Sequence, residues 1–369
     1  MKLFQRLLVA PAALGLLTPI SANANEVNLN EISNYSDVES IKFANFFNTD
    51  ALAESSLIAG GEGLVETSVD TSADSFSTTT TASFGSTFYV GSVDQGADDG
   101  VTTFTYDFAL DLSTSFTGED SLDVAIIGGN ADATAVDDAM GGDGTDDDML
   151  VLDGISYTFP LGGFTLIAGD GVGVDDLNTG ACAYSAFTDT ISDCGTSSVG
   201  GSADSAFAIG YDFGNGFTVA GGAGGGDSTS GYFTAEDDST IGLEAAYTTD
   251  LYGISVAYTD DESSGVDTTY WSFQGMIAPE GYPSISVGYE TDDDDADAIF
   301  AGLTFSEVGP GSVSLGMAST ELSSDDYYQY ELSYAYPLND GMTITPGVFI
   351  KETSGDDETG VVVTTSFSF

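Results

Sequence analysis

The stretch GVVVTTSFSF, residues 360–369, ends the chain and decides the fold. Side chains on an extended strand point alternately to two faces. One face of this strand then carries mostly apolar and aromatic side chains: Val361, Val363, Thr365, Phe367 and Phe369. The other face carries small and mostly polar ones: Val362, Thr364, Ser366 and Ser368. The ending is therefore typical of a sheet that is apolar on one side only.

The same alternation recurs along the chain and predicts about sixteen strands between residues 76 and 369. Residues 101–113 have an apolar face that consists of Phe104, Tyr106, Phe108, Leu110 and Leu112. The acids Asp107 and Asp111 fall on the opposite face. Residues 240–249 and 326–336 alternate in the same way, with Glu244 and Glu331 on their polar faces. The acids avoid the apolar face of all three strands.

The predicted connections alternate in length. The short ones are residues 160–163, 214–216, 249–252, 279–283, 307–311 and 337–341. The long, acidic ones are residues 128–148, 169–204, 221–238, 260–267, 291–297, 320–326 and 352–358. Short turns at one end and long polar loops at the other are typical of outer-membrane barrels. With an even number of strands, both chain ends lie on the short-turn, periplasmic side and every acidic loop faces outward.

The first 24 residues have the features of an export signal. Lys2 and Arg6 precede an apolar run over residues 7–17, and Ala22-Asn23-Ala24 fits a cleavage site. No later segment reaches the roughly 18 apolar residues that a membrane helix needs. We therefore expect a signal peptide at 1–24, a short irregular or helical periplasmic segment at 25–75, and a transmembrane antiparallel β-barrel at 76–369, because only a closed barrel pairs all its backbone groups in hydrocarbon.

The charge is strongly negative. After loss of the signal, Lys42 and Lys351 are the only bases against 60 acids, which gives a formal net charge of −58. Nucleic acid and anionic lipid surfaces are therefore not expected as partners. The chain has no histidine, which argues against the hydrolytic sites that need one to activate serine or water. No pair of carboxylates stands out as a glycosidase site, so no catalytic residue is expected.

The two cysteines, Cys182 and Cys194, lie in one loop segment rich in small and polar residues. In an exported protein this spacing predicts a loop disulfide. No redox or metal motif surrounds them.

Residues 104–130, FTYDFALDLSTSFTGEDSLDVAIIGGN, resemble the barrel region of cyanobacterial outer-membrane porins related to the carbohydrate-selective OprB-type family. The likeness rests on the pattern YD-x-x-L-x-L-x-TSFTG-x-D-x-L and on the GN that closes the stretch. It implies a homotrimeric porin in outer-membrane lipid, through which carbohydrates, inorganic ions and other small hydrophilic solutes diffuse passively. It also implies that Phe367 and Phe369 form the signal read by the barrel-assembly machinery.

The chain departs from this family pattern in two places. The S-layer-homology module is missing or reduced to residues 25–65, so attachment to peptidoglycan is not carried over. The family tends to have basic residues after TSFTG, where this chain has Glu119, Asp120, Ser121, Asp123 and Ala125. A preference for anions is therefore not carried over either.

The resemblance also points to a constriction, because the loop between strands five and six folds into the lumen of sixteen-stranded porins. Here that loop is 169–204, the longest connection, and its candidate selectivity acids are Asp170, Asp175, Asp176, Asp189 and Asp193. The inward wall adds Asp107, Asp111, Asp123, Glu244 and Glu331. A channel lined by one sign of charge enriches counter-ions, so the lining predicts a preference for cations. The alternative is an exposed surface loop.

Other interpretations stay open from the sequence. A secreted β-sandwich or β-solenoid has apolar strand faces too, and an acidic surface β protein that serves adhesion, hydration or calcium binding needs no pore. Aspartate runs at 143–148 and 292–295 suggest calcium, but neither matches an EF-hand loop. We expect no cofactor and no dedicated metal site, only weak, non-specific Ca²⁺ or Mg²⁺ binding at the acidic loops.

Overall fold

The computed structural model describes residues 80–368 with the exception of 96–99, 132–133, 143–144, 146–147, 202, 204, 227–238, 264–265, 294–295, 323–324 and 356. The predicted signal peptide, the predicted segment at 25–75 and Phe369 lie outside the described residues.

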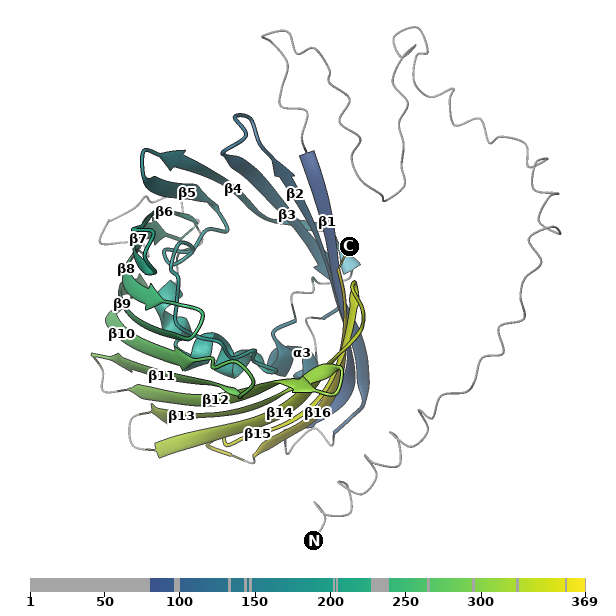
Figure 1. The fold of residues 1–369 in the computed structure, drawn as a ribbon. Helices are drawn as coiled ribbons and strands as arrows, with labels where there is room; N and C mark the ends of the chain where they lie inside the picture. The colour runs from purple at the N-terminus through teal and green to yellow at the C-terminus, as the bar shows by residue number, and fades with distance from the viewer. Residues whose placement is uncertain are drawn as a thin grey trace, which may run out of the picture. The chain divides into compact units, whose positions relative to one another are not determined.

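The strands form one closed antiparallel barrel, in which every strand pairs with its sequence neighbours and β1 pairs with β16 (Figure 1). The first eight strands are β1 (Thr80–Asp94), β2 (Thr103–Thr114), β3 (Ser121–Gly129), β4 (Val151–Leu161), β5 (Phe164–Asp170), β6 (Ser205–Asp212), β7 (Phe217–Gly225) and β8 (Ser239–Thr248). The last eight are β9 (Tyr252–Ser263), β10 (Val266–Ile277), β11 (Ser284–Asp292), β12 (Asp297–Val308), β13 (Gly311–Leu322), β14 (Asp325–Asn339), β15 (Met342–Lys351) and β16 (Glu358–Ser368). The predicted sixteen-stranded barrel is confirmed.

The last strand closes the barrel with the faces that its sequence predicts. Val361 on the outward face is 49% exposed, whereas Val362 on the inward face is fully buried. Val363 pairs with Val90 of β1 across the closing seam. On the outer side of this seam the ring of Phe367 meets the ring of Phe88 edge to face at 5.7 Å. The terminal stretch therefore joins the two ends of the sheet.

The outer face of the barrel is apolar. It includes the exposed side chains Phe104, Ile209, Ile241, Leu243, Ile254, Phe273, Val287, Ile299, Leu315, Leu332, Val348 and Ile350. Aromatic rings gather at the short-turn end, where Tyr211 contacts Phe164 at 4.9 Å and Phe213 at 4.7 Å between ring centroids. An apolar band bordered by aromatic rings is the surface that a barrel presents to lipid.

None of the helices in the described part of the chain has the length and apolarity needed to cross a membrane.

Several predicted acidic loops are shorter than expected because the strands extend into them. β9 runs to Ser263 and β10 begins at Val266, although the whole of 260–267 was predicted as a loop. Asp260 there pairs with Thr269 in the ladder. A strand of 12 residues spans roughly 30 Å along the axis of a tilted barrel, whereas the apolar band is about 25 Å tall. The acids therefore mark the rim above the band, where hydrogen bonding between strands continues.

The TSFTG segment, on which the family resemblance rests, is a turn organised by Asp120. Its Oδ1 accepts hydrogen bonds from the backbone N–H groups of Phe116 (2.9 Å) and Thr117 (2.8 Å) and from the Ser115 hydroxyl (2.8 Å). The Tyr157 hydroxyl donates to Oδ2 at 2.5 Å. These bonds, the one from Tyr157 foremost, hold the pKa of Asp120 well below its usual range. The motif is therefore explained by local structure at the turn end.

One prediction about the loops is wrong, because part of the 128–148 connection folds inward. Its helix α3 (Ala135–Met140) lies inside the ring of strands (Figure 1). Val136 is fully buried there in a cluster with Tyr89, Phe187 and Phe349. The Thr105 hydroxyl of β2 donates to the carboxylate of Asp137, which the helix buries. An apolar helix face and a buried hydrogen bond thus hold this segment against the inner wall.

Candidate pore constriction

The connection between β5 and β6, residues 171–204, lies inside the barrel along its inner wall, and we call it the inner loop (Figure 1). It contains two short 3-10 segments, η7 (Asp189–Gly195) and η8 (Ser197–Gly200). Most of its hydrogen bonds to the wall have a backbone group on the loop side. The loop is therefore positioned by its main chain, and the wall supplies the side chains that hold it.

Glu331 on β14 is the strongest of these attachments. Its Oε1 accepts from the Tyr184 hydroxyl and the Phe187 backbone N–H, both at 2.7 Å. Its Oε2 accepts from the Thr188 backbone N–H at 2.9 Å and from the Thr188 hydroxyl at 2.7 Å. The side chain is only 4% exposed. Four donors around one carboxylate satisfy its acceptor capacity and offset the cost of burying its charge.

Glu244 on β8 holds the first half of the inner loop. Its two oxygens accept from the backbone N–H groups of Thr179 at 2.6 Å and Gly180 at 2.9 Å. On β11, Glu290 accepts from the Ser198 N–H at 3.2 Å. Three wall carboxylates therefore bind successive parts of the inner loop.

Gln274 on β10 binds the inner loop with both ends of its amide. Its Oε1 accepts from the Ala181 N–H at 2.6 Å, and its Nε2 donates to the Asp193 carbonyl at 2.9 Å and the Thr196 hydroxyl at 2.8 Å. Next to it, the Ser286 hydroxyl of β11 accepts from the Ala183 N–H at 2.9 Å. This part of the wall bridges two passes of the same loop.

The wall beneath the inner loop has no side chains where the loop comes closest. A Cβ added to Gly288 would lie 1.9 Å from the Cys194 carbonyl oxygen, and one added to Gly347 would lie 2.4 Å from the Phe187 ring. Real Cβ atoms do not approach so closely, so glycine is required at these contacts.

Cys182 and Cys194 form a disulfide within the inner loop, with their Cα atoms 6.0 Å apart. Cys194 is buried in a cluster with Ile191 and Phe300. Asp193 and Cys194 both have left-handed backbone angles, with φ of 48° and 56°. The bridge closes a compact turn at the point where the loop meets Gly288.

The acids that the sequence predicted for the pore fall into different environments. Glu244 (7% exposed) and Glu331 are buried beneath the inner loop, so they position the loop and do not face the open lumen. Asp170 ends β5 opposite Ile155, on the outward face of its strand. On the inner loop, Asp176 and Asp189 are exposed and Asp175 is half-buried. These predicted acids therefore have three different positions: two are buried on the wall and hold the inner loop, others lie on the inner loop itself, and Asp170 faces outward.

Asp175 lines a cavity of about 310 Å³ between the inner loop and the wall, together with Asp193 and Glu244. Burial, with a further contribution from the charge of Asp193, raises the pKa of Asp175. Asp176 is exposed on the loop surface but partly desolvated by the surrounding protein, and this desolvation and the neighbouring Asp175 raise its pKa. These loop acids therefore protonate more readily than ordinary aspartates.

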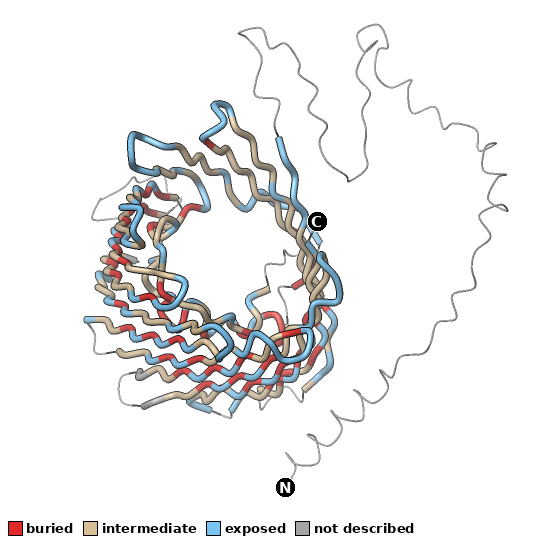
Figure 2. The backbone as a smooth tube through the Cα atoms, in the orientation of Figure 1, coloured by how far each residue is buried: buried red, intermediate tan, exposed pale blue. Residues whose placement is uncertain are grey.

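The inner wall across the ring from the inner loop is largely uncovered. Figure 2 shows few buried positions along β2–β4, whereas buried and exposed positions alternate along β8–β12. Asp107 is half-buried at the edge of this wall and accepts from the Thr87 N–H at 2.8 Å and from the hydroxyl of the buried Tyr89. Asp111 lies further along β2 toward the short-turn end, and Asp123 of β3 lies diagonally beside Asp111, opposite Ser113. Three of the predicted wall acids thus lie on the inward face of β2 and β3, with Asp107 the nearest of them to the inner loop, because its partner Tyr89 packs with Phe187.

Sequence reasoning missed three groups of the constriction. Glu290 falls on the inward face of β11 by simple alternation, but it directly precedes the predicted acidic loop at 291–297 and was not singled out. Gln274 and the wall glycines have no sequence signal, because their partners are backbone groups of a distant loop. Among the described residues, no group of three or more Cys, Asp or Glu side chains is arranged to hold a metal ion.

Solved structures with similar folds are bacterial porins. The OprB structure of Pseudomonas putida at high pH has a TM-score of 0.58 at 14% identity, over 79% of this chain and 94% of that one. A mutant of the Rh. blastica porin has a TM-score of 0.57 at 14% identity, over 79% and 100%. An anion-selective porin from Comamonas acidovorans has a TM-score of 0.56 at 15% identity, over 79% and 100%. At these identities the likeness establishes the fold.

No family model matches the sequence, and no curated protein matches it.

Proposed function

We propose that this chain is an outer-membrane porin through which small hydrophilic solutes and ions diffuse passively. The observation that carries the proposal is the inner loop, which buried wall carboxylates such as Glu331 hold inside a closed barrel. A soluble β-sandwich has no comparable lumen. The loop fills one side of the barrel and leaves the wall of β2–β4 uncovered, and this arrangement provides a narrowed passage (Figure 1).

The location in the outer membrane is supported by the surface of the barrel. Its outward side chains are apolar, and its aromatic rings cluster at the short-turn end. Sixteen strands without an open edge leave no unpaired backbone toward lipid. The family resemblance adds a homotrimer, with Phe367 and Phe369 read by the barrel-assembly machinery.

The pore prefers cations in this proposal. On the inward face of β2 and β3, Asp111 is exposed and Asp107 and Asp123 are half-buried, and Asp176 and Asp189 are exposed on the inner loop. Lys351 is the only basic residue after residue 79. Because the Debye length is about 8 Å at physiological salt, acids close to the passage dominate the selectivity, and those on distant loops serve solvation.

The solutes are inorganic ions and neutral molecules of carbohydrate size, and passage requires no catalytic group or cofactor. The second candidate is an acidic surface barrel that does not transport. The polar, uncovered wall of β2–β4 favours the pore, because a barrel without a passage has no need of a lumen lined by solvated acids.

Planar-bilayer recording of the purified full chain tests the proposal. A porin gives discrete conductance steps that scale with salt concentration. Protein that inserts as a folded barrel yet gives no steps refutes transport and leaves the surface-protein function.

A further inference from the structure

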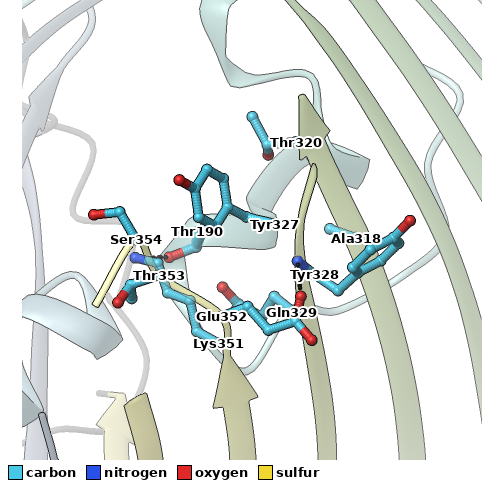
Figure 3. A pocket seen from close by; sticks show the side chains of 10 residues that line it. All are labelled: Thr190, Ala318, Thr320, Tyr327, Tyr328, Gln329, Lys351, Glu352, Thr353 and Ser354. Atoms are coloured by element: carbon cyan, nitrogen blue, oxygen red, sulfur yellow. Dashed lines mark hydrogen bonds between the residues drawn. The ribbon is translucent and has the colours of Figure 1, made fainter. Parts of the chain in front are cut away.

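The only base of the barrel, Lys351, lies in a cavity that the proposed passage of ions does not require. Lys351 is on the inward face at the loop end of β15 and pairs with Gln329 of β14, which in turn pairs with Ala318 of β13. Thr190 of the inner loop faces this patch of wall. Together these residues line a cavity of about 300 Å³ (Figure 3).

The ammonium group of Lys351 is held weakly within the protein, although Glu358 of β16 is its direct partner in the ladder. Its one hydrogen-bond partner among the described residues is the Thr190 hydroxyl, at the long distance of 3.4 Å. A lysine that faces a cavity without a carboxylate attached to it is available to an acceptor on a solute.

Gln329 supplies a hydrogen-bond acceptor, whereas Lys351 supplies donors. The Thr188 hydroxyl donates its proton to Glu331, so it can only accept from Gln329, and this fixes the Gln329 Nε2 toward Thr188. The Gln329 Oε1 therefore points elsewhere, and it is buried without a hydrogen-bond partner in the described structure. The residue is 4% exposed and its side chain lines the cavity. A buried acceptor of this kind is stabilised when a donor reaches it.

The rest of the lining is suited to a small amphipathic solute. Glu352 contributes a negative charge, with one carboxylate oxygen accepting from the Tyr328 N–H at 3.2 Å. Tyr327 and Ala318 offer apolar surface, and Tyr327 and Tyr328 point in opposite directions (Figure 3). The cavity thus combines a cation, an anion and an apolar wall, with an unsatisfied acceptor buried directly behind its surface.

We propose that this cavity binds small zwitterionic solutes of the α-amino acid class, which deepens the proposed porin function and rests on it. The carboxylate of the solute binds Lys351 and Thr190. Its ammonium group is attracted by Glu352 and by the Gln329 Oε1, which is buried in the cavity wall without a partner among the described residues. Its side chain packs on Tyr327.

The electrostatics of the pore favour a zwitterion over simpler solutes. A molecule of net negative charge is repelled by the acids of the rim and lumen, whereas a net-neutral zwitterion brings a carboxylate to Lys351 without that penalty. A simple ammonium ion is repelled by Lys351 and has no group to accept from it. A neutral polyol lacks a charged partner for either Lys351 or Glu352.

Three probes related to one parent molecule separate these cases: L-alanine, propionate, which lacks the ammonium group, and ethylamine, which lacks the carboxylate. Two measurements are made on the full chain, namely saturation-transfer NMR of each probe with detergent-solubilised protein and interruption of single-channel current. We expect binding and current interruption with L-alanine and neither with the other two. Lys351→Met should weaken L-alanine binding about tenfold or more, Thr190→Val should weaken it less, and Lys351→Arg should retain it.

Equal binding of L-alanine by the Lys351→Met variant, or equal binding of propionate or ethylamine by the native chain, overturns this proposal. If the protein shows no conductance steps but still binds L-alanine through Lys351, the porin function fails and the site remains. If it conducts but binds no L-alanine, the porin function stands and the site is wrong.

Discussion

The backbone N–H of Phe187 donates to Oε1 of Glu331 at 2.7 Å, so a carboxylate on the barrel wall fixes the main chain of the loop that narrows the lumen. The pairing changes the role of Glu331. Its position on the inward face predicts a pore-lining acid. Its burial instead makes it a positioning residue, whose carboxylate accepts hydrogen bonds from donors of the inner loop.

Glu331→Gln should release the inner loop without unfolding the barrel. The amide presents its own N–H₂ toward loop donors, and each buried donor left without an acceptor costs about 1–3 kcal/mol. We expect larger and noisier single-channel conductance. Asp111→Asn is the matched control, because it also removes one negative charge from the inner wall but from a residue that does not hold the inner loop. Native conductance in Glu331→Gln, with the barrel folded, would contradict the anchoring role.

Gly288→Ala should displace the inner loop from the wall. Its new Cβ would overlap the Cys194 carbonyl oxygen at 1.9 Å. Gly85→Ala is the control, because its Cβ would meet only the Ala109 Cβ at 3.9 Å. Conductance should change in the first variant and remain native in the second. Identical traces for the two would show that the loop does not rest on this wall.

Removal of the disulfide should loosen the inner loop. The double variant Cys182→Ser with Cys194→Ser loses the bridge that closes the turn against Gly288, so its open-channel current should fluctuate more. Reductant should have the same effect on the native chain and no further effect on the double variant. An unchanged current after verified reduction of the disulfide would contradict this prediction.

Asp120→Asn should destabilise the turn end, because it weakens the bonds to three donors in residues 115–117. The depressed pKa of Asp120 has a defined consequence for pH. A carboxyl with a lowered folded pKa contributes stability above its unfolded pKa of about 4 and loses it as pH falls toward the folded value. Heat-unfolding of the native barrel in detergent should therefore shift to lower temperature on acidification, and the Asp120→Asn variant should show less of this shift.

The fold was predictable from the sequence because the alternation of apolar and polar residues along a strand of a barrel separates the outward side chains from the inward ones. Val361 and Val362 show it directly, since neighbouring residues lie on opposite faces of β16. Alternation does not distinguish an inward residue that meets water from one that meets a loop. This is why Glu244 and Glu331 were assigned to the lumen, although the inner loop covers both.

The inward fold of α3 had a local signal that its acidic surroundings obscured. Thr134 caps the helix by accepting from the Asp137 N–H, and Gly141 ends it in a left-handed conformation. This pattern of a capping residue, an apolar position at Val136 and a terminal glycine is readable as a short helix. Its burial was not readable, because it depends on Phe187 and Phe349, far away in the chain.

The reversal potential across a bilayer in a salt gradient tests the central claim most directly. The account predicts cation preference in the native chain, because Asp107, Asp111 and Asp123 lie on the inward face of β2 and β3. Replacement of these three by asparagine should reduce that preference with little change in conductance steps. A native pore that prefers anions, or a preference unaffected by the triple replacement, would contradict the account.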